Sequence, residues 1–332
     1  MKCVSKLSKL CHASLSKAED QPVSPAIDTI ANPVRCEPVT IVATDGFRLS
    51  AHVYSTAIEQ RSSAVVVING GAGIRQRFYE PFAEFLASTG TPVILYDYRG
   101  IGGSRPRSLI GFAASVEDWG SKDCAAVINW ITDRFPGARL CVVGHSVGTL
   151  VTGFVTNGRL IDKMVLIGAH TGYWGDYRKD LRPVMFVAWH IFTPLITRLI
   201  GFFPGKALRV SEDLPTGVAL QWAERRKPDL WWNVRNEHGC RDFERIVKLR
   251  ARFEAISVPA LAISFTDDAF STESATQRLM ALYSNCSVTQ ERINPSILNV
   301  RRAGHFAFFR PKVSASLWAR VAEWIGNPAA IP

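Results

Sequence analysis

The chain has 332 residues, of which 47% are hydrophobic, and a formal net charge of +10 at pH 7. This length allows one large core, or one core with an inserted subdomain, in a protein of ordinary globular composition. The basic residues are scattered, and no zinc-finger, basic-zipper or RNA-binding signature occurs, so nucleic acid is not an expected partner. Seven cysteines are spread without a Cys-x-x-Cys pair, which favours a reducing, cytoplasmic compartment and no structural metal.

Residues 1–35 are expected to form a flexible N-terminal extension. Lysine, serine and apolar residues alternate in its first half without the unbroken apolar run of a secretory signal. A transit peptide is an alternative, because residues 1–17 lack acidic side chains, but they also lack the arginine that such peptides favour.

Strands and helices are then expected to alternate, which predicts a doubly wound, mostly parallel sheet. The first two strands form a hairpin whose turn contains Asp45-Gly46, a strong turn signal between alternating apolar residues. The expected strands cover residues 38–43, 47–54, 64–68, 93–96, 140–143, 164–167, 260–265 and 287–293. The expected helices cover residues 75–88, 117–133, 149–155, 271–283 and 314–324.

The alternation breaks between residues 171 and 258, which are rich in tryptophan, proline and charges. We expect this segment to form a helical cap over the carboxyl edge of the sheet, inserted into a core made of residues 36–170 and 259–332. Its apolar run, residues 184–203, can be interpreted as ordinary lid packing, as a wall for an acyl group, or as a membrane-spanning segment. Interruption by His190, Pro194 and Arg198 disfavours a span.

A nucleophile elbow is predicted at Gly144-His145-Ser146-Val147-Gly148, between an apolar strand and an apolar helix. Such a sharp turn places the central residue in a strained backbone conformation, and the flanking glycines leave room where strand and helix nearly touch. Ser146 would then be exposed at the carboxyl end of the sheet as a nucleophile. The alternative is a glycine-rich turn with an ordinary serine.

A serine nucleophile needs a base, and the base needs an acid that orients it. Asp267 and Asp268 follow a strand, and His305 follows the last strand. We expect Asp268 and His305 to complete the triad in the order Ser, Asp, His, with Asp267 as the alternative acid. The competing interpretations are a turn-forming aspartate pair and a packed core histidine; His145 is expected to be packing or edge lining.

Oxyanion stabilisation requires two N–H donors. The elbow provides the amide of Val147, and the glycine-rich loop after the third strand is expected to provide Gly71, with Ala72 as the alternative. The same glycine-rich loop also suggests an alternative function, the binding of a dinucleotide. However, Gln76 stands where the third glycine of that fingerprint belongs.

Taken together, these motifs resemble those of the α/β-hydrolase superfamily from about Val39 to Trp324. More closely, the chain is similar to a bacterial branch of predicted serine hydrolases near the serine aminopeptidase and monoacylglycerol lipase types. The resemblance implies a bracing role for Arg99. The chain departs from the pattern at Asn69, in place of the histidine of the common His-Gly oxyanion loop, and at Phe265, in place of the usual glycine. The motifs are Asn69-Gly70-Gly71-Ala72-Gly73, Asp97-Tyr98-Arg99-Gly100-Ile101-Gly102-Gly103-Ser104, the elbow, Ser264-Phe265-Thr266-Asp267-Asp268 and Gly304-His305-Phe306.

The expected chemistry is cleavage of a carboxylic ester or thioester through an acyl-enzyme, on a small-molecule substrate with an apolar part and without a metal or organic cofactor. Two other classes stay open: an acyltransferase that uses the same acyl-enzyme, and a non-catalytic binding protein. Peripheral membrane contact is a further alternative without support in the sequence, which also does not predict the oligomeric state.

Overall fold

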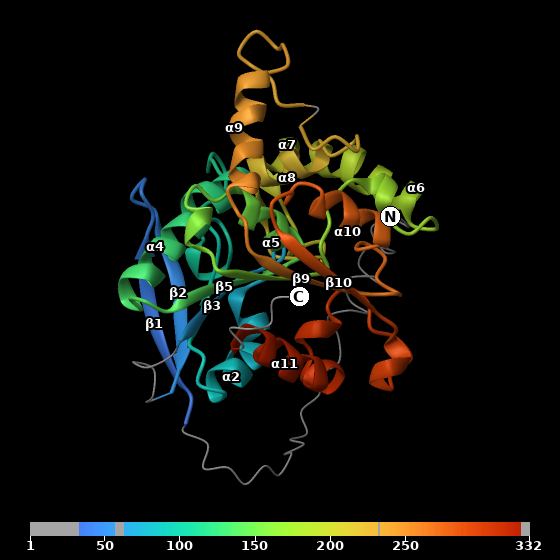
Figure 1. Ribbon diagram of the computed structural model, residues 1–332. Helices are drawn as coiled ribbons and strands as arrows, with labels where there is room; N and C mark the ends of the chain where they lie inside the picture. Colours follow the sequence, from blue (N-terminus) through green and yellow to red (C-terminus); the bar gives the residue numbers. More distant parts are fainter. Residues whose placement is uncertain (1–32, 57–62, 232, 327–332) are drawn as a thin grey trace.

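The computed structural model describes residues 33–56, 63–231 and 233–326. Of the predicted N-terminal extension, residues 1–32 lie outside the described residues. Eight strands form one sheet in the order β1-β2-β4-β3-β5-β6-β9-β10 (Figure 1). They are β1 (Arg35–Val42), β2 (Arg48–Ser55), β3 (Ala64–Asn69), β4 (Val93–Tyr96), β5 (Arg139–His145), β6 (Lys163–Ile167), β9 (Pro259–Phe265) and β10 (Ser287–Ile293).

The sheet is parallel from β4 to β10, and β1 and β2 form the predicted antiparallel hairpin at one edge. The prediction of a mostly parallel sheet is confirmed. The strand order reverses at β3, which lies between β4 and β5. In open sheets of this kind, ligands bind outside the carboxyl ends of the strands at such a reversal. The elbow at the end of β5 is therefore at the expected position for a site.

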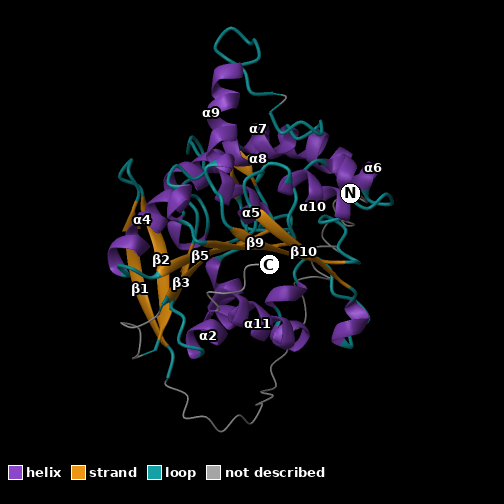
Figure 2. Ribbon diagram, viewed as in Figure 1, coloured by secondary structure: helices purple, strands orange, loops and turns teal. Residues whose placement is uncertain are grey.

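Helices cover both faces of the sheet (Figure 2). On one face, α2 (Glu80–Ser88) and α11 (Pro311–Gly326) bury Phe82, Leu86 and Trp318 against the strands. On the other face lie α4 (Ala125–Arg134), α5 (Val147–Val151) and α10 (Glu273–Met280). The sheet thus has an apolar core on each side, which explains why its central strands read as continuous apolar runs rather than as alternating ones.

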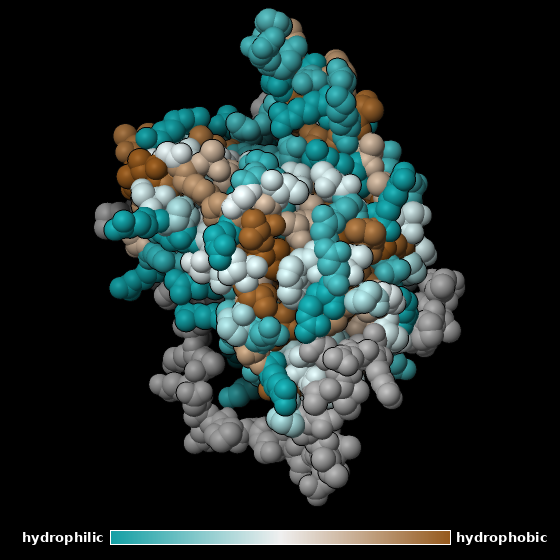
Figure 3. Space-filling view, turned by 90° about the vertical axis from the view of Figure 1, so that its left-hand side faces the viewer, coloured by the Kyte–Doolittle hydropathy of each residue, from teal (hydrophilic) through white to brown (hydrophobic). Residues whose placement is uncertain are grey.

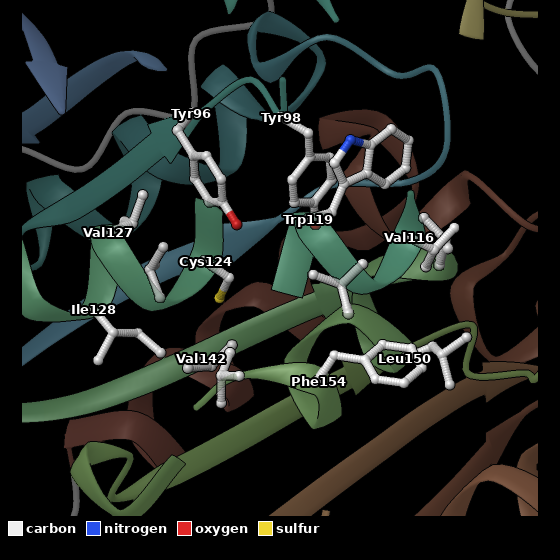
Figure 4. Close-up of a cluster of buried hydrophobic side chains, with 14 of the residues drawn as sticks. Tyr96, Tyr98, Val116, Trp119, Cys124, Val127, Ile128, Val142, Leu150 and Phe154 are labelled. Carbon is white, nitrogen blue, oxygen red and sulfur yellow. The ribbon is translucent and has the colours of Figure 1, made fainter. Parts of the chain in front are cut away.

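The helix expected over residues 117–133 is present as one continuous helical segment made of α3 (Val116–Asp118), a π-helical turn (Trp119–Cys124) and α4. Side-chain packing around the π-helical turn explains its geometry. Trp119 stacks on Tyr98, with ring centroids 4.7 Å apart and an interplanar angle of 11° (Figure 4). Gly120 lies so close to Phe154 that a Cβ atom there would be 2.5 Å from the Cβ of that side chain. The local departure from α-helical geometry, which sequence periodicity does not predict, accommodates these contacts.

Between β6 and β9 the chain forms helices that lie over the carboxyl edge of the sheet (Figure 1). They are α6 (Arg182–Val187), a π-helical turn (Ala188–Phe192), α7 (Thr193–Ile200), α8 (Thr216–Ala223) and α9 (Phe243–Glu254). We call this segment the cap. It also contains a short antiparallel pair, β7 (Phe202–Phe203) and β8 (Leu214–Pro215), that the sequence pattern did not predict.

The apolar run in the cap forms one helical segment, Arg182–Ile200, which ends at Gly201 with φ 85°. Among the described residues, it is the single helix long and apolar enough to cross a membrane, judged by length and composition, and 28% of its apolar window is buried. Val187, Ile191 and Leu195 are exposed on one side, whereas Met185 is buried. The segment is therefore amphipathic within the cap.

Helix α9 and the loop before it project from the molecule. The projection is mostly hydrophilic in Figure 3, where it forms the uppermost part of the view. The opposite end of α9 packs into the core, because Phe253 contacts Phe154 with ring centroids 5.3 Å apart and fills the space above Gly153.

Candidate active site

Ser146 lies in the turn between β5 and α5 with φ 54° and ψ −119°, a conformation that costs a non-glycine residue about 1–3 kcal/mol. Its amide N–H donates to the carbonyl of Ile167 over 2.9 Å, which fixes the turn to β6. A Cβ atom on Gly148 would lie 2.0 Å from the carbonyl oxygen of Asn69, and one on Gly144 would lie 2.9 Å from the backbone of Thr149. The close approach of strand, turn and helix therefore requires both glycines.

Asp268 and His305 form a buried pair at the same edge of the sheet. The Nδ1 atom of His305 lies 2.7 Å from Oδ2 of Asp268. The other oxygen of Asp268 accepts the amide N–H groups of Phe270 and Ser271, at 2.8 and 3.1 Å. Burial alone would raise the pKa of Asp268, but the nearby imidazole and these hydrogen bonds outweigh it and lower the pKa to about 2. The carboxylate therefore stays ionised and holds a proton on Nδ1 of His305.

Asp267 has a different environment from its neighbour. Its two oxygens accept the amide N–H groups of Ala303 and Gly304, at 2.9 and 3.0 Å. It thereby ties the loop that carries His305 to the end of β9. Of the two carboxylates proposed from the sequence, Asp268 contacts the imidazole and Asp267 anchors its loop.

A second histidine, which the sequence analysis did not identify, contacts the serine. The Nε2 atom of His170 lies 3.2 Å from Oγ of Ser146. The amide N–H of Gly172 donates to Nδ1 of His170 over 3.1 Å, so Nδ1 carries no proton and the neutral ring must carry it on Nε2. Burial, reinforced by the charge of His305, lowers the pKa of His170 to about 3. His170 is therefore a neutral hydrogen-bond donor to Ser146.

The signal for His170 was available in the sequence. It follows β6 at the carboxyl edge of the sheet, the same position that marked the other candidates. Within the described residues, Ser146 Oγ is hydrogen-bonded to His170 and not to His305, and Nε2 of His305 has no hydrogen-bond partner. Ser146, His170 and His305 all line one pocket, and the two imidazole centroids are 5.6 Å apart.

His145 links the predicted oxyanion loop to the loop of His305. The amide of Gly71 donates to the Tyr79 hydroxyl over 2.7 Å, and that hydroxyl lies 2.9 Å from Nδ1 of His145. The Nε2 atom of His145 lies 3.1 Å from the carbonyl oxygen of His305, to which it must donate. Burial, followed by the charge of His305, lowers the pKa of His145 to about 3. This neutral, buried ring packs at the edge of the site.

The same hydrogen bonds show which amides of the predicted oxyanion donors are engaged within the chain. Because the N–H of Gly71 is engaged by Tyr79, it is not directed at a substrate oxygen in this structure. The amides of Ala72, the alternative donor, and of Val147 have no acceptor among the described residues. Ala72 also lines the pocket with Ser146. The pair of free amides is therefore Val147 and Ala72.

Arg99 lies in a buried ion-pair network beside the site. Its Nε atom lies 2.6 Å from Asp123, and its terminal nitrogen lies 2.7 Å from Asp45. Its carbonyl accepts the indole N–H of Trp119 over 3.1 Å. Arg99 thus joins the loop after β4 to the hairpin and to the π-helical turn, and it does not line the pocket of Ser146.

The pocket above Ser146 is a cavity of about 120 Å³. Apart from the site residues, its walls are mostly apolar side chains of the cap, including Met185, Trp189 and Trp222. Within the described parts of the chain, no group of three or more His, Cys, Asp or Glu side chains is placed to hold a metal ion.

Comparison with known families places most of the chain in one of them. The family described as serine aminopeptidase, S33, matches residues 60–294, which contain Ser146 and Asp268 and end before His305.

Two curated relatives match shorter segments. A Mycobacterium tuberculosis (strain ATCC 25618 / H37Rv) protein described as uncharacterized is 34% identical over 116 residues, 34% of this chain and 38% of its own length. The quorum-quenching protein AidA of Acinetobacter baumannii (strain MDR-ZJ06) is 28% identical over 103 residues, 30% of this chain and 33% of its own length. The matched segment thus spans about a third of the length of each relative.

Solved structures share the fold at low identity. An esterase of Pyrococcus furiosus superposes with a TM-score of 0.56 and 16% identity, covering 88% of this chain and 90% of its own. A monoacylglycerol lipase of Paleococcus ferrophilus superposes with a TM-score of 0.52 and 16% identity, covering 83% of this chain and 98% of its own. At these identities the likeness concerns the fold, which both structures share with this chain.

Proposed function

This chain belongs to the serine aminopeptidase S33 family and is an α/β-hydrolase-fold enzyme, and from that premise we propose that it is a serine hydrolase. It cleaves a carboxylic ester or thioester bond of a partly apolar small molecule through an acyl-enzyme. Ser146 is the nucleophile, His305 the general base and acid, and Asp268 the residue that orients His305. No metal or organic cofactor takes part.

One observation carries the proposal. Ser146 occupies a strained turn on the rim of the same apolar pocket as His305, and the Nδ1 atom of His305 is hydrogen-bonded to an ionised, buried carboxylate. That bond keeps the proton on Nδ1 and leaves Nε2 of this pocket-lining imidazole with a free lone pair. The Nε2 atom is therefore able to accept a proton.

The choice of His305 over His170 as base rests on tautomers. His170 already carries its proton on Nε2, the atom that faces Ser146, and its other nitrogen is occupied by the Gly172 amide. It can therefore donate to the serine oxygen but cannot take the serine proton there. By occupying a lone pair of Oγ, His170 directs the hydroxyl proton elsewhere, and His305 is the acceptor in the same pocket.

In the first step, His305 takes the proton of Ser146 while Oγ attacks the carbonyl carbon, and the carbonyl oxygen becomes an oxyanion. The amides of Val147 and Ala72 donate to it. The imidazolium of His305, stabilised by Asp268, then gives its proton to the departing alcohol or thiol. A water molecule, deprotonated by His305, attacks the acyl-enzyme and returns Ser146 to its starting form.

The pocket favours a short to medium acyl or aromatic group. Its volume of about 120 Å³ is below the range of about 300–1,000 Å³ typical of drug-sized ligands, and its cap walls are apolar. This assigns the cap the role of an acyl-binding wall. A cytoplasmic location stays a prediction, and peripheral membrane contact stays an alternative that the sequence does not support.

A panel of nitrophenyl esters of graded chain length tests the proposal. We expect hydrolysis with saturable kinetics, a maximum at short or medium acyl chains and no turnover by Ser146→Ala. Ser121→Ala is a matched control, because Ser121 is a partly buried serine of the π-helical turn outside the pocket. No hydrolysis of any ester by the folded wild type would contradict the proposal.

The acyltransferase alternative uses the same acyl-enzyme and differs in what attacks it. It predicts that an added alcohol acceptor gives a new ester at the expense of the free acid. A non-catalytic binding protein predicts neither product. Product analysis with and without acceptor alcohols therefore separates the three functions.

A further inference from the structure

Arg225, directly after α8 in the cap, is buried without a counter-ion. The residue is 7% exposed, and its buried Nε atom has no hydrogen-bond partner among the described residues. Within the described residues, no carboxylate forms an ion pair with its guanidinium, and burial lowers its pKa to about 10 although the charges of Tyr177 and Glu224 oppose this shift. Arg225 is therefore still a cation at neutral pH, in an environment that opposes its charge.

Arg99 shows how this chain pairs an arginine that it buries for structural reasons. That side chain, 4% exposed, is bonded to both Asp45 and Asp123. Removing a charge from water is unfavourable unless a partner compensates, so buried arginines are normally paired in this way. Arg225 lacks the compensation that Arg99 has, which indicates that its partner is not part of the chain described here.

A cavity of about 210 Å³ lies next to Arg225, at the base of the projecting α9. Its walls include the cationic residues Arg225, Lys227, Arg235 and Arg245. The three carboxylates on its walls are engaged by other groups: Glu117 by Arg245 and Arg252, Asp229 by Arg241, and Glu224 by Asn233. Among the described residues, none of the three forms an ion pair with Arg225, although the charge of Glu224 partly offsets the effect of burial on the pKa of the guanidinium.

The cavity is next to the catalytic pocket. The guanidinium carbon of Arg225 lies 5.5 Å from the ring centroid of Trp222, and the other neighbours of this indole include His170, with ring centroids 5.7 Å apart. Trp222 therefore lies between Arg225 and the pocket of Ser146. The cation–π contact offsets part of the burial cost, but it leaves the buried Nε–H donor of the guanidinium without an acceptor.

We propose that the cavity beside Arg225 is an anion-binding site that takes a carboxylate or a phosphate group. An arginine guanidinium presents paired N–H donors that match both groups in bidentate geometry. The anion is either the charged end of the ester substrate or a separate small molecule. The first source rests on the proposed ester hydrolysis, whereas the binding itself does not.

The binding test compares wild type, Arg225→Met, Arg225→Lys and Arg245→Gln in thermal unfolding and calorimetry. The probes are inorganic phosphate and sodium succinate, with chloride used to hold ionic strength constant. Arg245→Gln is the matched control, because Arg245 lines the same cavity but its guanidinium is paired with Glu117 at 2.7 Å. We expect one or both probes to raise the melting temperature of wild type and Arg245→Gln. Arg225→Met should lose this rise, and Arg225→Lys should bind at least several-fold more weakly than wild type.

Without probes, Arg225→Met should melt no lower than wild type, because an uncompensated buried charge is replaced by an apolar side chain. A melting temperature clearly below wild type, or an Arg225→Met protein that does not fold, would show that the guanidinium has partners in the chain and would overturn the proposal. So would a wild type that neither probe stabilises, or an equal rise in Arg225→Met.

A second experiment identifies the source of the anion. The kcat/KM for a nitrophenyl hemisuccinate is divided by that for nitrophenyl butyrate. A ratio at least tenfold lower in Arg225→Met assigns the anion to the substrate, whereas an unchanged ratio with succinate binding lost assigns it to a separate molecule. If neither ester is hydrolysed, the proposed function fails while the binding result stands.

Discussion

Two adjacent carboxylates allow the triad to be tested by matched substitutions. In Asp268→Asn, the amide N–H groups of Phe270 and Ser271 still require the remaining oxygen. The new NH₂ group must then face Nδ1 of His305, now at 2.7 Å from Oδ2. Because an NH₂ group donates, Nδ1 must become the acceptor and the imidazole proton moves to Nε2. The base is then protonated on the wrong nitrogen.

The expected loss in kcat is about 10³–10⁴-fold, or about 4–5.5 kcal/mol of transition-state stabilisation. Asp267→Asn makes the same chemical change one residue away. It leaves one of the amides of Ala303 and Gly304 without an acceptor, which should cost about 1–2 kcal/mol of folding stability and less than about tenfold in kcat. The assay is nitrophenyl ester hydrolysis with urea unfolding in parallel. Equal losses of activity in the two variants, or an Asp268→Asn enzyme within about tenfold of wild type, would refute the reasoning.

Three further predictions concern the histidines and the elbow. His305→Gln should lower kcat by at least about 10³-fold, whereas His170→Gln, which can still donate to Ser146, should lower it by about tenfold or less; the reverse order in ester hydrolysis would make His170 the base. Because burial lowers the pKa values of His145 and His170 from 6.5 to about 3, the unfolded chain binds more protons between those values, and the free energy of unfolding should fall as pH drops from about 6 to 4. Each histidine contributes up to about 1.4 kcal/mol per pH unit, so urea titrations should show a shallower fall in His170→Gln, and an unchanged slope would count against a buried neutral ring. Gly148→Ala should lose about 3 kcal/mol or more, because its Cβ would meet the carbonyl of Asn69 at 2.0 Å, while Gly326→Ala, with open space around it, should stay within about 0.5 kcal/mol of wild type.

Local signals predicted most of the core. Strands β3, β5 and β9 are short apolar runs bounded by turns in the sequence. In the structure both faces of these strands are buried, which is why their apolar composition identified them. The π-helical geometry of Trp119–Cys124, inside a helix that the periodicity did predict, was not predictable because it depends on tertiary contacts with Tyr98 and Phe154. The short β7–β8 pair in the cap is two residues long on each side, too short for periodicity to register.

In the site, chain order and strand ends brought Ser146, Asp268 and His305 to one edge, as the sequence led us to expect. The second oxyanion donor was harder to predict, because whether the amide of Gly71 or of Ala72 is free depends on where the hydroxyl of Tyr79, eight residues after Gly71, is placed by packing. His170 was overlooked because it lies where the strand–helix alternation ends. Like the predicted site residues, however, it follows the carboxyl end of a strand, β6. The lack of a partner for Arg225 had no sequence signal at all.

The central claim, that the hydroxyl of Ser146 is a nucleophile activated by His305, is tested most directly by covalent labelling. Folded wild type is treated with a fluorophosphonate, and the adduct is mapped by peptide mass spectrometry, with Ser146→Ala and His305→Gln in parallel. We predict one stoichiometric adduct on Ser146, none on Ser146→Ala and labelling slowed at least about 10³-fold in His305→Gln. An unlabelled wild type, or an adduct that persists on Ser146→Ala, would contradict the account.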